Sequence, residues 1–123
     1  MSKQQSGFTL VELVMLIVIL GILAATAIPR FVDFKVDTQQ ASTDGIAGAL
    51  GSASAINYAV RSAHSAKGAA VGDCRDVAGL LEGGLPAGYS ITGREIAAGT
   101  TEPACTVTGP GGKTATFVGH GIS

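Results

Sequence analysis

Charged side chains are scarce in this 123-residue chain, of which only 14% is Asp, Glu, Lys or Arg. So few charges exclude a solenoid or a long exposed coiled coil, and a hydrophobic share of 46% excludes a disordered chain. Eight Lys and Arg against nine Asp and Glu give a net charge of −1, which leaves no basic surface for nucleic acid. The length is that of one small domain.

Catalytic and metal-binding groups are also missing. The sequence contains no acid–base or nucleophile constellation, and two cysteines are too few for a four-ligand zinc site. His64 and His120 have no third ligand, so we expect solvent-exposed structural roles for both. Residues 109–114, GPGGKT, resemble the end of a phosphate loop, but Val107 stands where that motif needs its first glycine. This segment therefore predicts a hairpin turn.

One long apolar run is present near the N-terminus, over residues 8–28. Only four residues interrupt it: Thr9, Glu12, Gly21 and Thr26. Its 21 residues make about 31 Å of helix, the thickness of a bilayer core, and predict a membrane-spanning helix. The alternative is a cleaved secretory signal peptide, for which residues 24–27 offer an Ala-x-Ala type site.

A single carboxylate, Glu12, lies inside this run. A charge at the centre of a membrane helix costs about 2.5–3.5 kcal/mol, and no Lys, Arg or His lies within two helical turns to pair with it. One interpretation is a tolerated carboxyl near the helix end. The other is a partner from another chain, and a free amine on a processed N-terminus at Phe8 is one candidate.

The residues around Glu12 match a known pattern. The segment SGFTLVEL, residues 6–13, resembles the class III signal of type IV pilins and type II secretion pseudopilins. The match includes the short polar leader, Gly7 and Phe8 at the scissile bond, and Glu12 four residues later. Pro29 also stands where this family usually has a proline. The resemblance is close over residues 1–60 and only architectural beyond Ser62.

The resemblance implies how the N-terminus is processed and used. An inner-membrane prepilin peptidase would remove residues 1–7 after Gly7 and methylate Phe8. Residues 8–28 would anchor the precursor in the inner membrane and later polymerise in the core of a helical filament. There Glu12 would meet the Phe8 amine of an adjacent subunit and set the register. The stretch between Gly21 and Pro29 would be the place where the helix kinks or melts.

The function implied is structural. The chain would be the major pilin of an extracellular type IV pilus, a fimbrium used for cell adhesion, twitching motility or DNA uptake. Its partners would be copies of itself, the peptidase and the inner-membrane assembly machinery, with no cofactor, small-molecule substrate or enzymatic activity. The alternative within the family is a type II secretion pseudopilin, but residues 109–123 carry no acidic residue for that protein's calcium loop. A monomeric membrane-anchored binding module would leave Glu12 unexplained.

The rest of the chain, residues 29–123, predicts a globular pilin domain of α+β class. We expect the helix to continue from Thr9 to Ala63, followed by a loop over residues 64–88 with a short helix at 75–81. Glycine and proline then punctuate an antiparallel meander with strands at 89–92, 95–98, 104–108 and 114–118.

Two features of the second helical half predict how it packs. Apolar residues recur at spacings of 3, 4, 3 and 4, which predicts the helix face that the sheet covers: Ile46, Ala49, Ala53, Ile56 and Val60. Glycines also recur every third residue, at Gly45, Gly48 and Gly51. They favour a small-residue face that lets the sheet pack close, and the alternative is a contact zone between subunits.

Cys74 and Cys105 are the only cysteines. An exported chain with an even count predicts one disulfide, worth about 3–4 kcal/mol in the chain-entropy account. The alternative is two free buried thiols. Many type IVa pilins place their disulfide at the C-terminal end, whereas 18 residues follow Cys105 here, so the receptor-binding role of that loop is not transferred.

Overall fold

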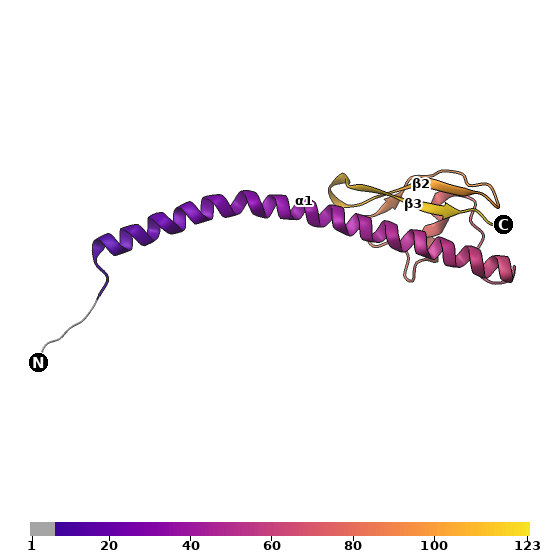
Figure 1. The fold of residues 1–123 in the computed structure, drawn as a ribbon, viewed down its shortest axis with the longest axis horizontal. Helices are drawn as coiled ribbons and strands as arrows, with labels where there is room; N and C mark the ends of the chain where they lie inside the picture. The colour runs from indigo at the N-terminus through magenta and orange to yellow at the C-terminus, as the bar shows by residue number, and fades with distance from the viewer. Residues whose placement is uncertain (1–6) are drawn as a thin grey trace, which may run out of the picture. The chain divides into compact units, whose positions relative to one another are not determined.

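A single long helix, α1, carries the N-terminal half of the protein. The computed structural model describes residues 7–123, with side chains at all of these except 27–33 (Figure 1). Helix α1 spans Leu10–Ala63, 54 residues, so both of its predicted ends are confirmed within one residue. The chain divides into two compact units, one ending at Lys35 and the other formed by Val36–Ser123.

The second unit adds a small sheet to the end of α1. After α1 come the 3₁₀ helix η1 (Cys74–Leu80), strands β1 (Ser90–Ile91) and β2 (Thr101–Thr108), the short turn η2 (Pro110–Gly112) and strand β3 (Thr114–His120). The strands form an antiparallel meander in the order β1-β2-β3, lying along the C-terminal half of α1 (Figure 1). The predicted α+β class, the short helix and the hairpin turn at residues 109–114 are therefore confirmed.

The expected strand at residues 95–98 is wrong. Glu95 makes only an isolated bridge to Asp73, and the N–H of Ile96 donates to the carbonyl of Gly72 at 2.9 Å. Ile96 is buried, so this segment is tied to the chain that leads into η1 rather than to the meander. Strand β2 instead begins at Thr101 and carries Pro103 through a register irregularity, a position where a missing N–H is tolerated.

The helix face that packs on the sheet also differs from the predicted one. The buried residues of α1 keep the spacing of 4, 3, 4 and 3 but form a neighbouring stripe: Thr43, Ala47, Leu50, Ser54 and Asn57. Of the predicted stripe, Ile56 is 64% exposed and Val60 is 39% exposed. Apolar periodicity alone therefore selected the wrong face of a correctly predicted helix.

Hydrogen bonds to distant parts of the chain explain why two polar residues, Ser54 and Asn57, occupy the buried stripe. Ser54 Oγ accepts the backbone N–H of His120 at 2.8 Å. The amide of Asn57 brackets Ala69, with Nδ2 donating to its carbonyl at 2.9 Å and Oδ1 accepting its N–H at 2.8 Å. Because the Ser54 and Asn57 side chains have hydrogen-bond partners, burying them costs little free energy. The helix face that carries them can therefore pack on the sheet in place of the predicted apolar face. These contacts fasten the C-terminal strand and the loop after α1 to the helix.

Candidate functional site

The chain enters α1 through an exposed, non-helical segment. Gly7 and Phe8 precede the helix, and the Phe8 side chain is 82% exposed. A Cβ at Gly7 would meet no atom within 4 Å, so nothing in the fold itself requires glycine there. The bond between these two residues is accessible, as a cleavage site for an external protease needs to be.

Glu12 has a partner inside its own chain, which corrects the premise that it is unpaired. Its Oε2 accepts the N–H of Thr9 at 3.3 Å, and the N–H of Glu12 donates to Thr9 Oγ1 at 3.2 Å. These reciprocal bonds form a capping box, whose T-x-x-E pattern is legible in the sequence and was missed. Thr9 therefore holds the Glu12 carboxylate at the start of α1, where the helix dipole also favours a negative charge.

The first part of α1 presents apolar side chains all around its surface. Every large apolar side chain between Leu10 and Leu23 is at least 47% exposed. Among the described residues, no helical stretch reaches the length and hydropathy needed to cross a membrane. Gly21 lies within this helical part, and a Cβ there would meet no atom within 4 Å. Pro29, the other expected kink residue, lies outside the residues with described side chains.

Cys74 and Cys105 form a disulfide. The Cα atoms are 5.6 Å apart, and both residues are fully buried. The bond joins the start of η1 to the middle of β2, so it ties the long loop after α1 to the sheet. A Cβ at Gly119 on β3 would stand only 2.9 Å from Cys105 Sγ, which explains the glycine beside the bond.

The start of η1 is fixed by a second capping box. Asp73 accepts the N–H and Nε of Arg75 at 2.9 and 3.0 Å, and Asp76 Oδ2 accepts the N–H of Asp73 at 3.0 Å. The hydrogen bonds from the Arg75 side chain and backbone lower the pKa of Asp73 to about 2. These contacts set the position of Cys74, the next residue.

This pKa predicts an acid-dependent loss of stability. Because the folded-state value is depressed, the contribution of Asp73 is present above its ordinary pKa of 3.8 and is lost as the pH falls to about 2. In Asp73→Asn, which keeps a capping oxygen, we expect the thermal midpoint of the full chain to fall less between pH 5 and pH 2 than in the unsubstituted protein. The midpoints are measured by circular dichroism. If they fall by the same amount in both proteins between pH 5 and pH 2, the lowered pKa of Asp73 is contradicted.

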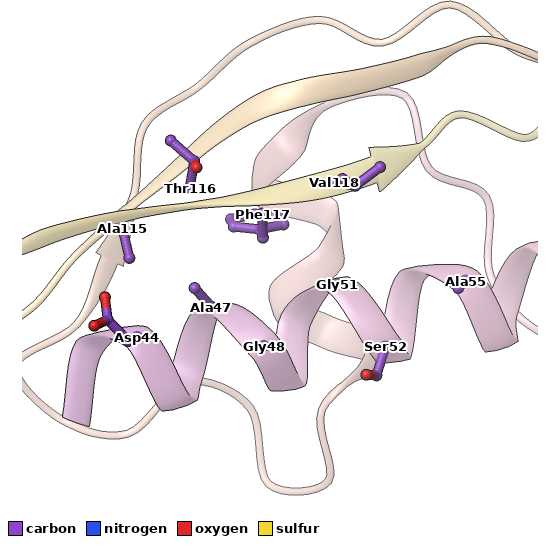
Figure 2. Close-up of a pocket in the computed structure, with 10 residues that line it drawn as sticks. All are labelled: Asp44, Ala47, Gly48, Gly51, Ser52, Ala55, Ala115, Thr116, Phe117 and Val118. Carbon is purple, nitrogen blue, oxygen red and sulfur yellow. The ribbon is translucent and has the colours of Figure 1, made fainter. Parts of the chain in front are cut away.

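A groove of about 800 Å³ lies between α1 and β3 (Figure 2). Six residues of α1 and four of β3 line it: Asp44, Ala47, Gly48, Gly51, Ser52, Ala55 and Ala115 to Val118. Figure 2 shows Ala115 and Phe117 pointing toward the helix and Thr116 pointing away from it. The expectation that the sheet packs closely on the glycines is wrong for Gly45 and Gly48, where a Cβ would meet no atom within 4 Å. Sequence reasoning missed this groove because it arises only when helix and strand come together.

The two histidines lie at the ends of α1 and β3. Among the described residues, no group of three or more His, Cys, Asp or Glu side chains could hold a metal ion. His64 is exposed just after the end of α1. His120 ends β3, with its ring centroid 5.6 Å from that of Tyr58. Both histidines were predicted to be solvent-exposed. His120 is only partly exposed, because it packs against Tyr58.

Comparison with protein families gives a match at the N-terminus. A family described as the prokaryotic N-terminal methylation motif matches residues 2–28. That range contains the Gly7–Phe8 junction, the Thr9–Glu12 capping box and the start of the apolar helix. No solved structure matches the chain.

Curated relatives extend the similarity beyond the motif. The type IV narrow pilus major component PilA5 of Thermus thermophilus is 44% identical over 86 residues, which are 70% of this chain and 68% of that protein. A fimbrial protein of Pseudomonas aeruginosa is 43% identical over 61 residues, 50% of this chain and 36% of that protein. The fimbrial protein EcpC of Eikenella corrodens is 39% identical over 80 residues, 64% of this chain and 52% of that protein.

Proposed function

This chain belongs to the type IV pilin family, and on that premise we propose that it is the major structural subunit of an extracellular type IV pilus. The observation that carries the proposal is the similarity of more than two thirds of the chain to a protein named as a pilus major component. The exposed apolar surface of α1 supports it, because a helix with no covering partner in its own subunit is suited to polymerisation.

We propose that the N-terminus is processed as the family motif implies. A prepilin peptidase cuts between Gly7 and Phe8, which the exposed, non-helical backbone there supports, and the new Phe8 amine is methylated. The helix from residue 8 to 28 anchors the precursor in the inner membrane and then transfers, with the help of the assembly machinery, into the filament. Gly21 and Pro29 mark the part of the helix proposed to kink or melt on that transfer.

Glu12 and Phe8 are proposed to form the contact that sets the axial register. In the free subunit the capping bond from Thr9 holds the carboxylate at the helix start, 3.3 Å from the Thr9 nitrogen. In the filament the amine of an adjacent subunit would add a charged partner at the same place. Because both charges are taken out of water there, the pair specifies register more than it adds net stability.

A structural role needs no catalytic activity, and the relatives are named as pilus and fimbrial components. We therefore propose that the chain is not an enzyme. No observation favours the type II secretion pseudopilin over the pilin. The mature subunit is proposed to reside in the inner membrane before assembly and at the cell surface afterwards.

Processing is tested by the mass of the mature subunit in sheared surface fibres. We expect residues 8–123, plus the net CH₂ of one methylation and minus two hydrogens for the disulfide. Fibres seen by electron microscopy that contain this subunit would support the major-pilin role. A mature chain that begins after Ala27 would instead indicate an ordinary secretory signal, and fibres lacking the chain would overturn the role.

A further inference from the structure

A small cavity opens where the sheet splits beyond β1. The N–H of Thr92, directly after β1, still donates to the carbonyl of Thr106 on β2 at 3.0 Å. Arg94 then leaves the sheet, because its carbonyl accepts the N–H of Cys74 at 2.8 Å. The divergence leaves a cavity of about 350 Å³, a volume at the lower end of the range of small-molecule sites. Five residues line it: Thr92, Gly93, Arg94, Ala104 and Thr106.

Hydrogen bonds hold the polar side chains at this cavity in place. Arg94 Nη1 donates to Glu102 Oε1 at 3.2 Å, and the same oxygen accepts the N–H of Ala104 at 3.1 Å. Thr106 Oγ1 donates to the carbonyl of Ala104 at 3.3 Å. Within the described part of the chain, the Thr92 hydroxyl and the other N–H groups of the Arg94 side chain have no partner. The Arg94 guanidinium is therefore fixed while it keeps free donors, which lowers the entropy cost of binding a ligand.

The charges beside the cavity favour a neutral ligand. Arg94 pairs with Glu102 at 3.2 Å, and Arg75, whose guanidinium carbon lies 2.9 Å from the Cβ position of Gly93, pairs with Asp73 at 3.0 Å. Because each arginine has a carboxylate partner, an anion would be repelled by the carboxylates and a cation by the arginines. An apolar ligand would cover the free N–H groups of Arg94 without bonding to them. The ligand that suits these groups is uncharged and rich in hydroxyl groups.

Two rows of hydroxyl groups, the hydroxyl rows, continue from the cavity across the outer face of the sheet. They come from three neighbouring strand segments: Ser90, Thr108 and Thr114 form one row, and Thr92, Thr106 and Thr116 form the other. Val107 and Phe117, which alternate with these residues, are buried, and Figure 2 shows Thr116 pointing away from α1. None of the six side chains is charged. Because neighbouring strands lie about 4.8 Å apart, one ligand can reach several of these hydroxyl groups at once.

We propose that this surface binds a neutral polysaccharide, with one sugar unit in the cavity beside Arg94 and the next units along the hydroxyl rows. The inference rests on the proposed function, and it names the class of material to which the pilus adheres. Sugar hydroxyl groups both donate and accept, so they suit guanidinium donors, a carboxylate acceptor and threonine hydroxyls. Among the described residues that form the cavity and the rows, none is aromatic, so one subunit binds weakly without stacking. A fibre that repeats the site many times gains avidity.

Removing two hydroxyl groups tests the site, with a matched control on the same strand. Thr92→Val and Thr106→Val, made together, keep β-branched side chains of similar size, so the sheet should fold. We expect fluorescently labelled sheared fibres of this variant to bind the neutral glycans of a mixed neutral and acidic glycan array about tenfold less well. Thr101→Val, the same change at an exposed residue of β2 that does not line the cavity, should reduce binding less than about twofold. Equal losses, or unsubstituted fibres that bind only acidic glycans, would overturn the proposal.

A change of charge distinguishes a binding site from a purely structural cluster. Glu102→Gln keeps an oxygen for Arg94 and Ala104 but leaves the Arg94 charge without its carboxylate partner. Fibres of this variant should therefore bind acidic glycans about fivefold better than unsubstituted fibres do. An unchanged preference between neutral and acidic glycans would overturn the assignment of Arg94 to the site. If the unsubstituted chain forms no fibres, the proposed function fails, whereas fibres that bind no glycan overturn this inference alone.

Discussion

Removing the Cys74–Cys105 disulfide is expected to lower the free energy of unfolding of the unit Val36–Ser123 by about 3–4 kcal/mol. The bond closes a loop of 31 residues and joins η1 to β2, so its loss frees the unfolded chain and loosens the link between loop and sheet. For a unit of this size the loss corresponds to a fall of roughly 15 °C or more in the thermal midpoint. The measurement is a circular dichroism melt of the full chain carrying Cys74→Ser and Cys105→Ser, with fibre yield as a second readout.

Two controls separate the bond from its surroundings. Because both cysteines are fully buried, serine also buries two hydroxyl groups, so the pair Cys74→Ala and Cys105→Ala measures the loss of the bond without that penalty. Reduction of the unsubstituted protein should give a similar fall. Alkylation without a reductant should label neither cysteine in the exported subunit. An unchanged midpoint in the alanine pair would mean that the bond contributes nothing to stability.

The elements that the sequence predicted well are those specified locally. The length of α1 follows from an apolar run continued by helical periodicity, and Gly68, which adopts positive φ, lies in the turn that follows its end at Ala63. The hairpin at η2 follows from Pro110 and the glycines after it, of which Gly111 and Gly112 adopt positive φ. The order of the meander follows from short strands separated by turns.

The errors arose where packing decided the outcome. The predicted stripe from Ile46 to Val60 is apolar throughout, but the sheet covers the neighbouring face, whose polar residues have specific partners. Ser54 is selected by the N–H of His120 and Asn57 by the backbone of Ala69, which are 66 and 12 residues away in the sequence. Such long-range pairs cannot be identified from the spacing of apolar residues.

Only part of the candidate site could be predicted from the sequence, because the rest depends on long-range packing. Gly7, Phe8 and Glu12 belong to one short motif and are legible as such. The Thr9–Glu12 capping box is equally local, but the partner of the carboxylate is a backbone N–H, which a survey of nearby Lys, Arg and His side chains does not show. The groove between α1 and β3 is lined by residues as far apart in the sequence as Gly48 and Thr116, which are 68 residues apart, so no local sequence pattern predicts it.

Neutralising Glu12 is expected to abolish fibre assembly while leaving the subunit intact. Glutamine retains a side-chain oxygen for the Thr9 N–H, so Glu12→Gln keeps the capping box and the start of α1. Because glutamine is uncharged, the free-energy cost of placing this helix in a bilayer is also lower. The variant should therefore be inserted into the membrane, be cleaved after Gly7 and accumulate as membrane-bound subunit. Only the proposed charged contact with the Phe8 amine of a neighbour would be removed.

The size of the effect follows from what remains in the filament. The Phe8 amine would stay buried without its partner, and leaving one member of a buried ion pair unpaired costs about 3–5 kcal/mol. The ratio of sheared fibre to membrane-bound subunit should therefore fall about a hundredfold or more when the variant is the sole subunit. Asp37→Asn is the matched control, because it neutralises an exposed carboxylate on the same helix and should leave the ratio unchanged. If Glu12→Gln assembles as well as this control, the carboxylate acts only as a helix cap and another contact sets the register.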